Sequence, residues 1–262
     1  MIHETCLAFL FLTVGLWRPG VMSAQPLRIT VVYNNVPQTP GLTTAWGFAA
    51  LIESGTDVVL FDTGGDGPTL LANLAKLDIE PRRVAAIILS HAHADHTGGL
   101  DGFLAQNHDV TVYLPRSFAL AFVREVETRG ARVVTVTGPQ RLLANLHTTG
   151  VLSDGIDEQA LVIDTDSGLV VITGCAHPDV VRIARAARAT HGKDIYLLMG
   201  GFHLGDRSLE QNRATVAALR ELGVRKVAPS HCTGDQAVAL FREAWGSDFR
   251  EGGCGAVIHV PS

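Results

Sequence analysis

The densest group of residues that could do chemistry is a short stretch holding His91, His93, Asp95 and His96. It follows the apolar run at residues 84–89, which predicts a buried strand. Imidazole nitrogens and a carboxylate oxygen form a donor mixture suited to Zn²⁺, Mn²⁺ or Fe²⁺. A polar loop with chance histidines does not account for four donors in six residues. The stretch therefore predicts a metal site at the end of a strand.

The spacing within this stretch is compatible with two metal ions. His91 and His93 are two residues apart in an extended segment, so both side chains can point to the same side. After a turn at Ala94, Asp95 and His96 can face a nearby point. One ion would then be held by the first pair and a second ion by the other. Two ions roughly 3.5–4 Å apart can stabilise both the attacking and the leaving oxygen of a substitution.

Further candidates follow other strand-like runs, each ending in a loop rich in Gly, Asp or His: Asp62, His177, His203 and His231. In layered α/β folds the loops at strand ends converge on one crevice. We expect His177 and His231 to complete the two ligand sets, one for each ion, although either taken singly could be structural. His177 precedes Pro178 at a predicted helix start, whose positive end keeps an imidazole neutral for ligation.

Three more residues have open roles. Asp62 either makes a turn or accepts an N–H from a ligand histidine and so sets its tautomer. His203 could be a ligand, a general acid or base, a donor to substrate phosphate or a structural histidine; we assign it, with the ligand Asp95, to catalysis. Cys175 and Cys232 are groups that support the ligands, occasional ligands themselves, or small buried thiols.

The surrounding pattern alternates between strands and helices and predicts an α/β fold. Strands are predicted at residues 27–33, 46–53, 58–61, 84–89, 110–114, 169–173, 195–199, 226–229 and 255–260, with two or three short strands within 131–165. Helices are predicted from Pro68, over 117–129, after Pro178, from Asp206 or Ser208 to Gly223, and from Asp235. Gln211 completes a capping box for Ser208.

Composition narrows the protein class. The 262 residues are 47% hydrophobic and carry a formal net charge of −5. They predict a single domain at residues 25–262, and the negative charge and lack of long basic runs argue against nucleic acid as a partner.

The beginning of the chain is typical of a signal peptide. Residues 6–17 are apolar, and Ser23-Ala24 follow, which predicts cleavage after Ala24 and removal of residues 1–24. The protein would then be periplasmic or secreted, with no stable membrane insertion. Glu4, Met22 and the lack of an early Lys or Arg point instead to a retained anchor or a mis-chosen start, and without a signal the protein would be cytoplasmic. Cleavage would leave three cysteines, an odd number that gives no disulfide framework.

The motif His91-x-His93-x-Asp95-His96, preceded by Asp62 at a strand end, resembles the signature of the metallo-β-lactamase superfamily. The resemblance implies a four-layer αββα sandwich with a two-metal site at one edge of its two sheets. Further motifs resemble the branch of the 7,8-dihydropterin-6-methyl-4-(β-D-ribofuranosyl)aminobenzene-5′-phosphate synthase-like proteins. They are Phe61-Asp62-Thr63-Gly64, Gly174-Cys175-Ala176-His177, Gly200-Gly201-Phe202-His203-Leu204 and His231-Cys232-Thr233-Gly234.

The chain departs from these patterns in two places. Many superfamily hydrolases carry a bridging aspartate in a Thr-Gly-Asp sequence, where this chain has Cys175. The bridge would then be water alone, or Cys175 or His203 would replace the aspartate, and Asp157 or Glu158 could supply an oxygen ligand. The branch usually has glycine where this chain has Asp179, a carboxylate that would weaken binding of an anionic substrate.

These observations lead us to expect a metal-dependent hydrolase that uses a metal-activated water on an ester, lactone, thioester or phosphoester. Its cofactors would be two divalent transition-metal ions, zinc first, with manganese and iron as alternatives. Its partner would be a small-molecule substrate, with anionic compounds among the candidates. The first alternative is a pterin-related transferase in which the ions activate a leaving diphosphate. The second is a non-catalytic metal- or ligand-binding protein, because the bridging aspartate is absent.

Overall fold

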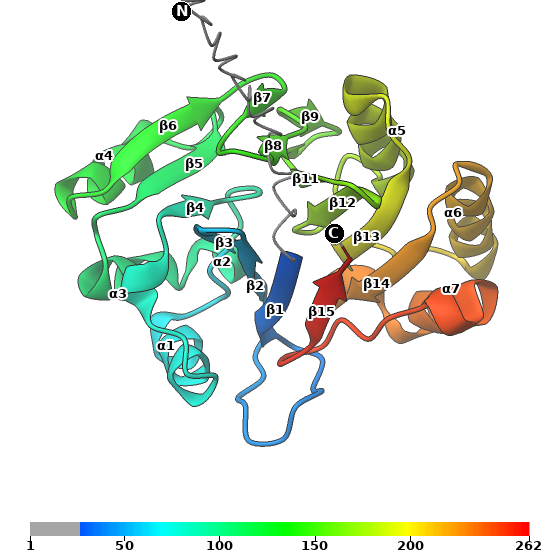
Figure 1. The fold of residues 1–262 in the computed structure, drawn as a ribbon, viewed down its shortest axis with the longest axis horizontal. Helices are drawn as coiled ribbons and strands as arrows, with labels where there is room; N and C mark the ends of the chain where they lie inside the picture. Colours follow the sequence, from blue (N-terminus) through cyan, green and yellow to red (C-terminus); the bar gives the residue numbers. More distant parts are fainter. Residues whose placement is uncertain (1–26, 262) are drawn as a thin grey trace, which may run out of the picture.

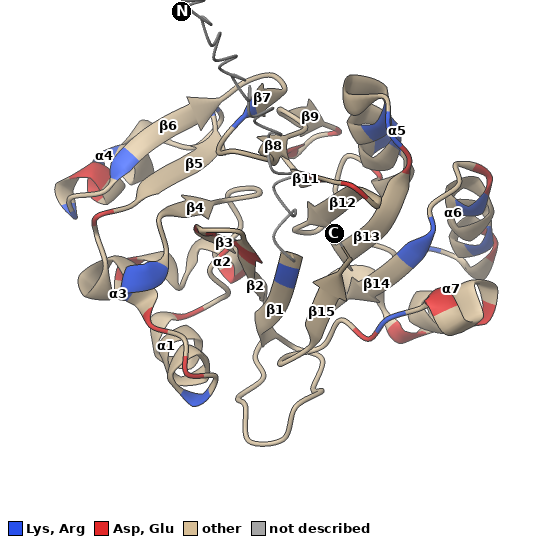
Figure 2. Cartoon of the chain, viewed as in Figure 1, with Lys and Arg blue, Asp and Glu red and all other residues tan. Residues whose placement is uncertain are grey.

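The computed structural model describes residues 27–261. Two β-sheets face each other, and helices cover the outer face of each (Figure 1). This arrangement is the predicted four-layer αββα sandwich. Charged residues lie on the outer helices and in the loops, while the central strands carry few (Figure 2).

The first sheet has seven strands in the order β15-β1-β2-β3-β4-β5-β6. The strands are β1 (Leu27–Asn34), β2 (Phe48–Ser54), β3 (Asp57–Phe61), β4 (Ala86–Ile88), β5 (Thr111–Pro115), β6 (Arg132–Val136) and β15 (Val257–Val260). Its outer face is covered by α1 (Gly67–Lys76), α3 (Leu100–Gln106) and α4 (Leu120–Thr128). The one-turn helix α2 (Ala94–Thr97) lies in the loop after β4.

The second sheet has six strands in the order β14-β13-β12-β11-β8-β7. They are β7 (Gln140–Arg141), β8 (Leu146–Thr148), β11 (Leu161–Thr165), β12 (Gly168–Thr173), β13 (Ile195–Gly201) and β14 (Lys226–Ser230). Its outer face is covered by α5 (Val180–His191), α6 (Leu209–Glu221) and α7 (Asp235–Trp245). A separate ribbon pairs β9 (Leu152–Ser153) with β10 (Asp157–Glu158).

The apolar runs are continuous because the strands are buried on both faces. In β2, Phe48, Ala50 and Ile52 point into the core between the two sheets. Ala49 and Leu51 alternate with them and pack against the helices of the first sheet. Burying one such Leu or Ile contributes roughly 1.5–3 kcal/mol.

The strand directions place six loops at one edge of the sandwich. β3 and β4 are parallel, and so are β12, β13 and β14. β1 runs in the same direction as β3, because both are antiparallel to β2. Because the carboxyl ends of parallel strands meet at the same edge of a sheet, the loops that carry the candidate residues converge there.

Some expected elements differ from those observed. Six strands, β6 to β11, lie within residues 131–165, so the prediction of two or three is wrong. Three of them, β7, β9 and β10, have only two residues each. They are defined by pairing with a neighbouring strand and are too short to show an alternating hydrophobic pattern. Helix α3 was not predicted; it packs against α1 where Gly102 meets Gly67. The capping box of Ser208 and Gln211 at the start of α6 is confirmed.

The predicted signal segment, residues 1–24, lies outside the residues that the structure describes. Within residues 27–261, no helix combines the length and apolar character that a bilayer crossing requires.

Candidate metal centre

Backbone strain is concentrated at the loops where the two sheets meet. Six non-glycine residues of the described chain have a positive φ, and five of them lie here: Asp62, Ala176, Asp179, His203 and His231. Their φ angles lie between 50 and 79°. Such conformations cost on the order of 1–3 kcal/mol each and persist where the surrounding structure imposes them, most often at functional sites.

The structure brings the six predicted ligands together in two sets, and it decides that His177 joins His91 and His93 while His231 joins Asp95 and His96. The first set, His91, His93 and His177, has donor atoms within 4.8 Å of one another. The second set, Asp95, His96 and His231, forms one such group together with Cys175. Within it, Asp95 Oδ2 lies 3.5 Å from His96 Nε2 and 3.3 Å from His231 Nε2.

Asp62 orients His96 directly and His91 through Ser90. Asp62 Oδ2 lies 2.7 Å from His96 Nδ1 and accepts the Ser90 hydroxyl proton at 2.7 Å. Ser90 Oγ, having donated its own proton, can accept the Nδ1–H of His91 at 2.8 Å. Both imidazoles are thereby held with the proton on Nδ1, so that the Nε2 lone pairs are free. The backbone of Asp62 also turns, at φ 55°, so both expected roles are present.

The other two buried imidazoles have comparable partners. Glu158 Oε2 lies 2.8 Å from His177 Nδ1, and the Glu158 carboxylate also accepts the backbone N–H groups of Cys175, Ala176 and His177. Asn35 Oδ1 accepts from His231 Nδ1 at 2.8 Å. Glu158 therefore supports His177, which corrects the suggestion that it supplies an oxygen ligand.

The electrostatics of the site keep His91 and His96 neutral and Asp95 ionised. Burial lowers the pKa of His91 to about 3 and that of His96 to about 4. Burial alone would raise the pKa of Asp95, but the adjacent His231 and His96 hold it below its ordinary range. Neutral imidazole and ionised carboxylate are the forms that bind metal.

Two buried nitrogen atoms show that these residues fit a cation. His91 Nε2 and His231 Nε2 are buried and have no hydrogen-bond partner. An unsatisfied buried polar atom costs roughly 1–3 kcal/mol. One such atom faces each donor set, and the imidazole and carboxylate chemistry suits a divalent transition metal.

Two further residues lie beside the donor sets. Cys175 Sγ is 3.2 Å from His96 Nε2. The His203 ring lies 4.5 Å from the His177 ring, measured between centroids. A hydrogen bond with Cys232 raises the pKa of His203.

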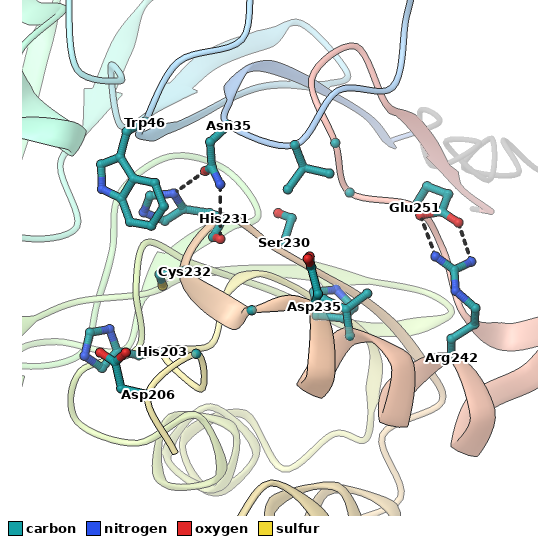
Figure 3. A pocket seen from close by; sticks show the side chains of 17 residues that line it. Asn35, Trp46, His203, Asp206, Ser230, His231, Cys232, Asp235, Arg242 and Glu251 are labelled. Atoms are coloured by element: carbon teal, nitrogen blue, oxygen red, sulfur yellow. Dashed lines mark hydrogen bonds and ion pairs between the residues drawn. The ribbon is translucent and has the colours of Figure 1, made fainter. Parts of the chain in front are cut away.

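A pocket of about 510 Å³ opens beside His203 and His231 (Figure 3). Its polar and aromatic lining includes Asn35, Trp46, His203, Asp206, Ser230, His231, Cys232, Asp235, Arg242 and Glu251. Trp46 is 60% exposed and its ring lies 4.9 Å from the His231 ring. Arg242 forms an ion pair with Glu251. The pocket is thus lined by several carboxylates and by one arginine that is already paired.

The Asp179 carboxylate forms hydrogen bonds and an ion pair within the protein. Asp179 Oδ1 accepts the backbone N–H groups of Val181 and Arg182 at the start of α5. Its Oδ2 accepts from Arg207 at 3.2 Å. The carboxylate that replaces glycine is thus partly neutralised by a helix cap and an ion pair.

Sequence reasoning missed Asn35, Ser90 and Trp46. Asn35 had a usable signal, because it follows β1, whose carboxyl end lies at the same edge as Asp62. Ser90 directly precedes His91, but its bonds depend on Asp62, which is 28 residues away. Trp46 lies in a loop and had no signal in the sequence.

The fold and the two donor sets define an α/β sandwich with candidate metal-binding groups at one edge. A model of the metallo-beta-lactamase superfamily matches residues 47–231, and the chain belongs to this superfamily.

Two relatives share more with the chain than the fold. The 7,8-dihydropterin-6-methyl-4-(beta-D-ribofuranosyl)-aminobenzene-5′-phosphate synthase of Methanocaldococcus jannaschii is 31% identical, over 76% of this chain and 83% of that protein. Tm1679, described as a metal-dependent hydrolase of the beta-lactamase superfamily, is 29% identical with a TM-score of 0.77, over 90% of this chain and 100% of that one. The short form of human tRNase Z, 14% identical with a TM-score of 0.62 over 90% of this chain and 100% of its own, shares the fold alone. The relatives thus include both a synthase and a hydrolase.

Proposed function

We propose that the chain is a metal-dependent hydrolase with two divalent ions, one in each donor set. The observation that carries this proposal is the convergence of six donors, of which His231 also lines the pocket, with two buried Nε2 atoms that lack partners. Bound there, such ions would lower the pKa of a water molecule and polarise the substrate's carbonyl or phosphoryl oxygen.

In this proposal Asp95 and His203 have two different roles in the reaction. The ionised Asp95 carboxylate accepts a hydrogen bond from the attacking water and orients it. His203 lines the pocket and donates a proton to the leaving oxygen or sulfur as the bond to the acyl carbon or phosphorus breaks. The elevated pKa of His203 supports this role.

The pocket favours a substrate that carries little negative charge. Asp206, Asp235 and Glu251 line it, and among its described lining residues Arg242 is the single Lys or Arg and is paired with Glu251. An anionic group away from the metal centre would face these carboxylates. The exposed ring of Trp46 offers a flat apolar surface next to His231. We therefore place an uncharged ester, lactone or thioester ahead of a phosphoester.

A substrate screen tests the proposal. Protein reconstituted with zinc, manganese or iron is assayed on p-nitrophenyl esters, lactones, thioesters and p-nitrophenyl phosphates, with and without a chelator. We expect chelator-sensitive turnover that His96→Ala reduces to the chelator-treated level and that His259→Ala, at an exposed strand position, leaves unchanged. Turnover that survived His96→Ala, or none on any substrate class, would refute the hydrolase proposal.

Trp46→Ala tests the substrate contact. It should raise KM roughly 3–10-fold and change kcat less, because an aromatic contact contributes about 0.5–1.5 kcal/mol to binding. An unchanged KM for substrates with planar groups would show that Trp46 does not bind them.

A second candidate is a synthase that joins a pterin to a ribofuranosyl-aminobenzene phosphate and releases diphosphate. The 31% identity to the M. jannaschii synthase favours it. Release of pyrophosphate that requires a pterin substrate would support this function over hydrolysis. The acidic lining of the pocket is the observation against it.

A further inference from the structure

Cys175 lies between the two donor sets. It follows β12, and its Sγ is within 4.8 Å of a donor atom of Asp95, His96 and His231. The same sulfur is within 4.8 Å of a donor atom of His177, which belongs to the other set. Among the described residues, Cys175 alone lies in a donor group with Asp95, His96 and His231 and also in a donor group with His177.

The backbone around Cys175 brings the sulfur close to these donors. A Cβ on Gly174 would overlap Ser90 Oγ, and a Cβ on Gly201 would lie 2.7 Å from Cys232 Sγ and 3.2 Å from Cys175 Cα. Glycine at these two positions therefore lets the ends of β12 and β13 approach each other and the loop after β4. The Cys175 side chain is buried, and two of its backbone neighbours are tied to Glu158.

The contact between Cys175 and His96 has a separation close to that of two ligands of one metal ion. His96 carries its proton on Nδ1, toward Asp62, so its Nε2 accepts the Cys175 S–H at 3.2 Å. Sulfur and nitrogen ligands of one tetrahedral zinc ion lie about 3.5 Å apart, from bond lengths of about 2.3 and 2.0 Å. His231 Nε2 in the same set is buried and has no hydrogen-bond partner, which is an independent sign of a cation there.

We propose that the Cys175 sulfur is a metal ligand shared by both donor sets, in the place of the bridging aspartate of the Thr-Gly-Asp sequence. The proposal rests on the metal centre of the proposed function. On binding, the S–H bond loses its proton to solvent and the thiolate contacts both ions. A soft thiolate at the centre favours zinc, iron(II) or cobalt over magnesium and manganese.

Cobalt titration of the metal-free full chain tests this directly. A thiolate bound to cobalt(II) gives a charge-transfer absorption in the near ultraviolet. We expect the band to grow up to two equivalents of cobalt, because both ions contact the same sulfur. Cys175→Ser should abolish the band and weaken the binding of cobalt by about 10–100-fold.

Two other cysteines serve as controls. Cys254→Ser, a buried thiol outside every donor group of the described chain, should keep the band. Cys232→Ser, whose sulfur lies 3.7 Å from the Cys175 carbonyl, should also keep it. If Cys175→Ser fails to fold, Cys175→Asp replaces it: this variant should bind two equivalents of cobalt without the band.

Three results would overturn the shared ligand. They are a band that persists in a folded Cys175 variant, a band lost in Cys232→Ser, and a band that saturates at one equivalent. The readout needs no turnover, so it is separate from the proposed function. Hydrolysis without the band would refute the thiolate ligand and leave the hydrolase proposal standing. The band without hydrolysis would refute the hydrolase proposal and leave the thiolate ligand standing.

Discussion

Asp62→Asn should weaken metal binding, because one buried carboxylate sets the tautomers of two candidate ligands. Asp62 Oδ1 accepts the Ser90 backbone N–H at 2.7 Å. Its Oδ2 accepts from the Ser90 hydroxyl and from His96 Nδ1, each at 2.7 Å. Asparagine can keep the first bond, but its NH₂ group would then face two donors. His96 must either lose its partner or move its proton to Nε2, the atom that a metal requires.

The magnitude follows from these contacts. Each buried donor left without an acceptor costs roughly 1–3 kcal/mol. Loss of a partner that orients a metal-bound histidine typically weakens metal binding about 10–100-fold, or about 1.4–2.8 kcal/mol. We expect this loss mainly in the set that contains His96. The set that contains His91 is affected less, because Ser90 lies between His91 and Asp62.

The assay is a competition titration of zinc against a chromophoric chelator, with circular dichroism to confirm folding. Ser90→Ala is the matched variant: it cuts the link to His91, keeps the contact from Asp62 to His96, and should weaken the other set. Asp101→Asn, on the exposed side of α3, should change neither affinity. Wild-type affinity for two equivalents in a folded Asp62→Asn variant would refute the role of Asp62.

Three further predictions concern the metal-free chain in the presence of a chelator. Glu158→Gln replaces an acceptor of four N–H groups and should lower the free energy of unfolding by about 2–6 kcal/mol in urea denaturation, and a loss below about 1 kcal/mol would contradict this. Asp179→Ala and Asp179→Gly both lose the cap of α5, but only glycine relieves the backbone strain at φ 79°. Asp179→Ala should therefore lower the thermal stability more than Asp179→Gly. The reverse order in thermal denaturation would contradict the strain. Burial lowers the pKa of His91 to about 3 and that of His96 to about 4, so the stability they contribute is lost as pH falls from about 6.5 toward these values. Burial raises the pKa of Asp62 to about 7, which acts in the opposite sense between about pH 7 and 4. Near pH 5.5 the unfolded chain binds two protons, on His91 and His96, that the folded chain does not, and the folded chain binds one, on Asp62, that the unfolded chain does not. The free energy of unfolding should therefore fall by about 1.4 kcal/mol per pH unit on acidification. A rise in stability, measured by urea denaturation at several pH values, would contradict this prediction.

The sequence by itself determined the α/β class, the strands that carry the site, the six candidate ligands, and the separation of His91 and His93 from Asp95 and His96. Which set His177 and His231 each join came from the structure. These features are local: apolar runs mark strands buried on both faces, and each donor comes within a few residues of a strand end. Because the carboxyl ends of parallel strands meet at one edge, local position was enough to predict that His91, His177 and His231 lie together.

Only the tertiary structure decided which groups hold those ligands in place. Asn35 contacts His231 from 196 residues away, and Glu158 contacts His177 from 19 residues away across a different strand. Hydrogen bonds of this kind depend on ångström-level placement of two chain segments, and no spacing along the chain encodes it. The same holds for Cys175, whose identity is visible in the sequence. Its position between the two donor sets arises from the close approach of strands that the glycines allow.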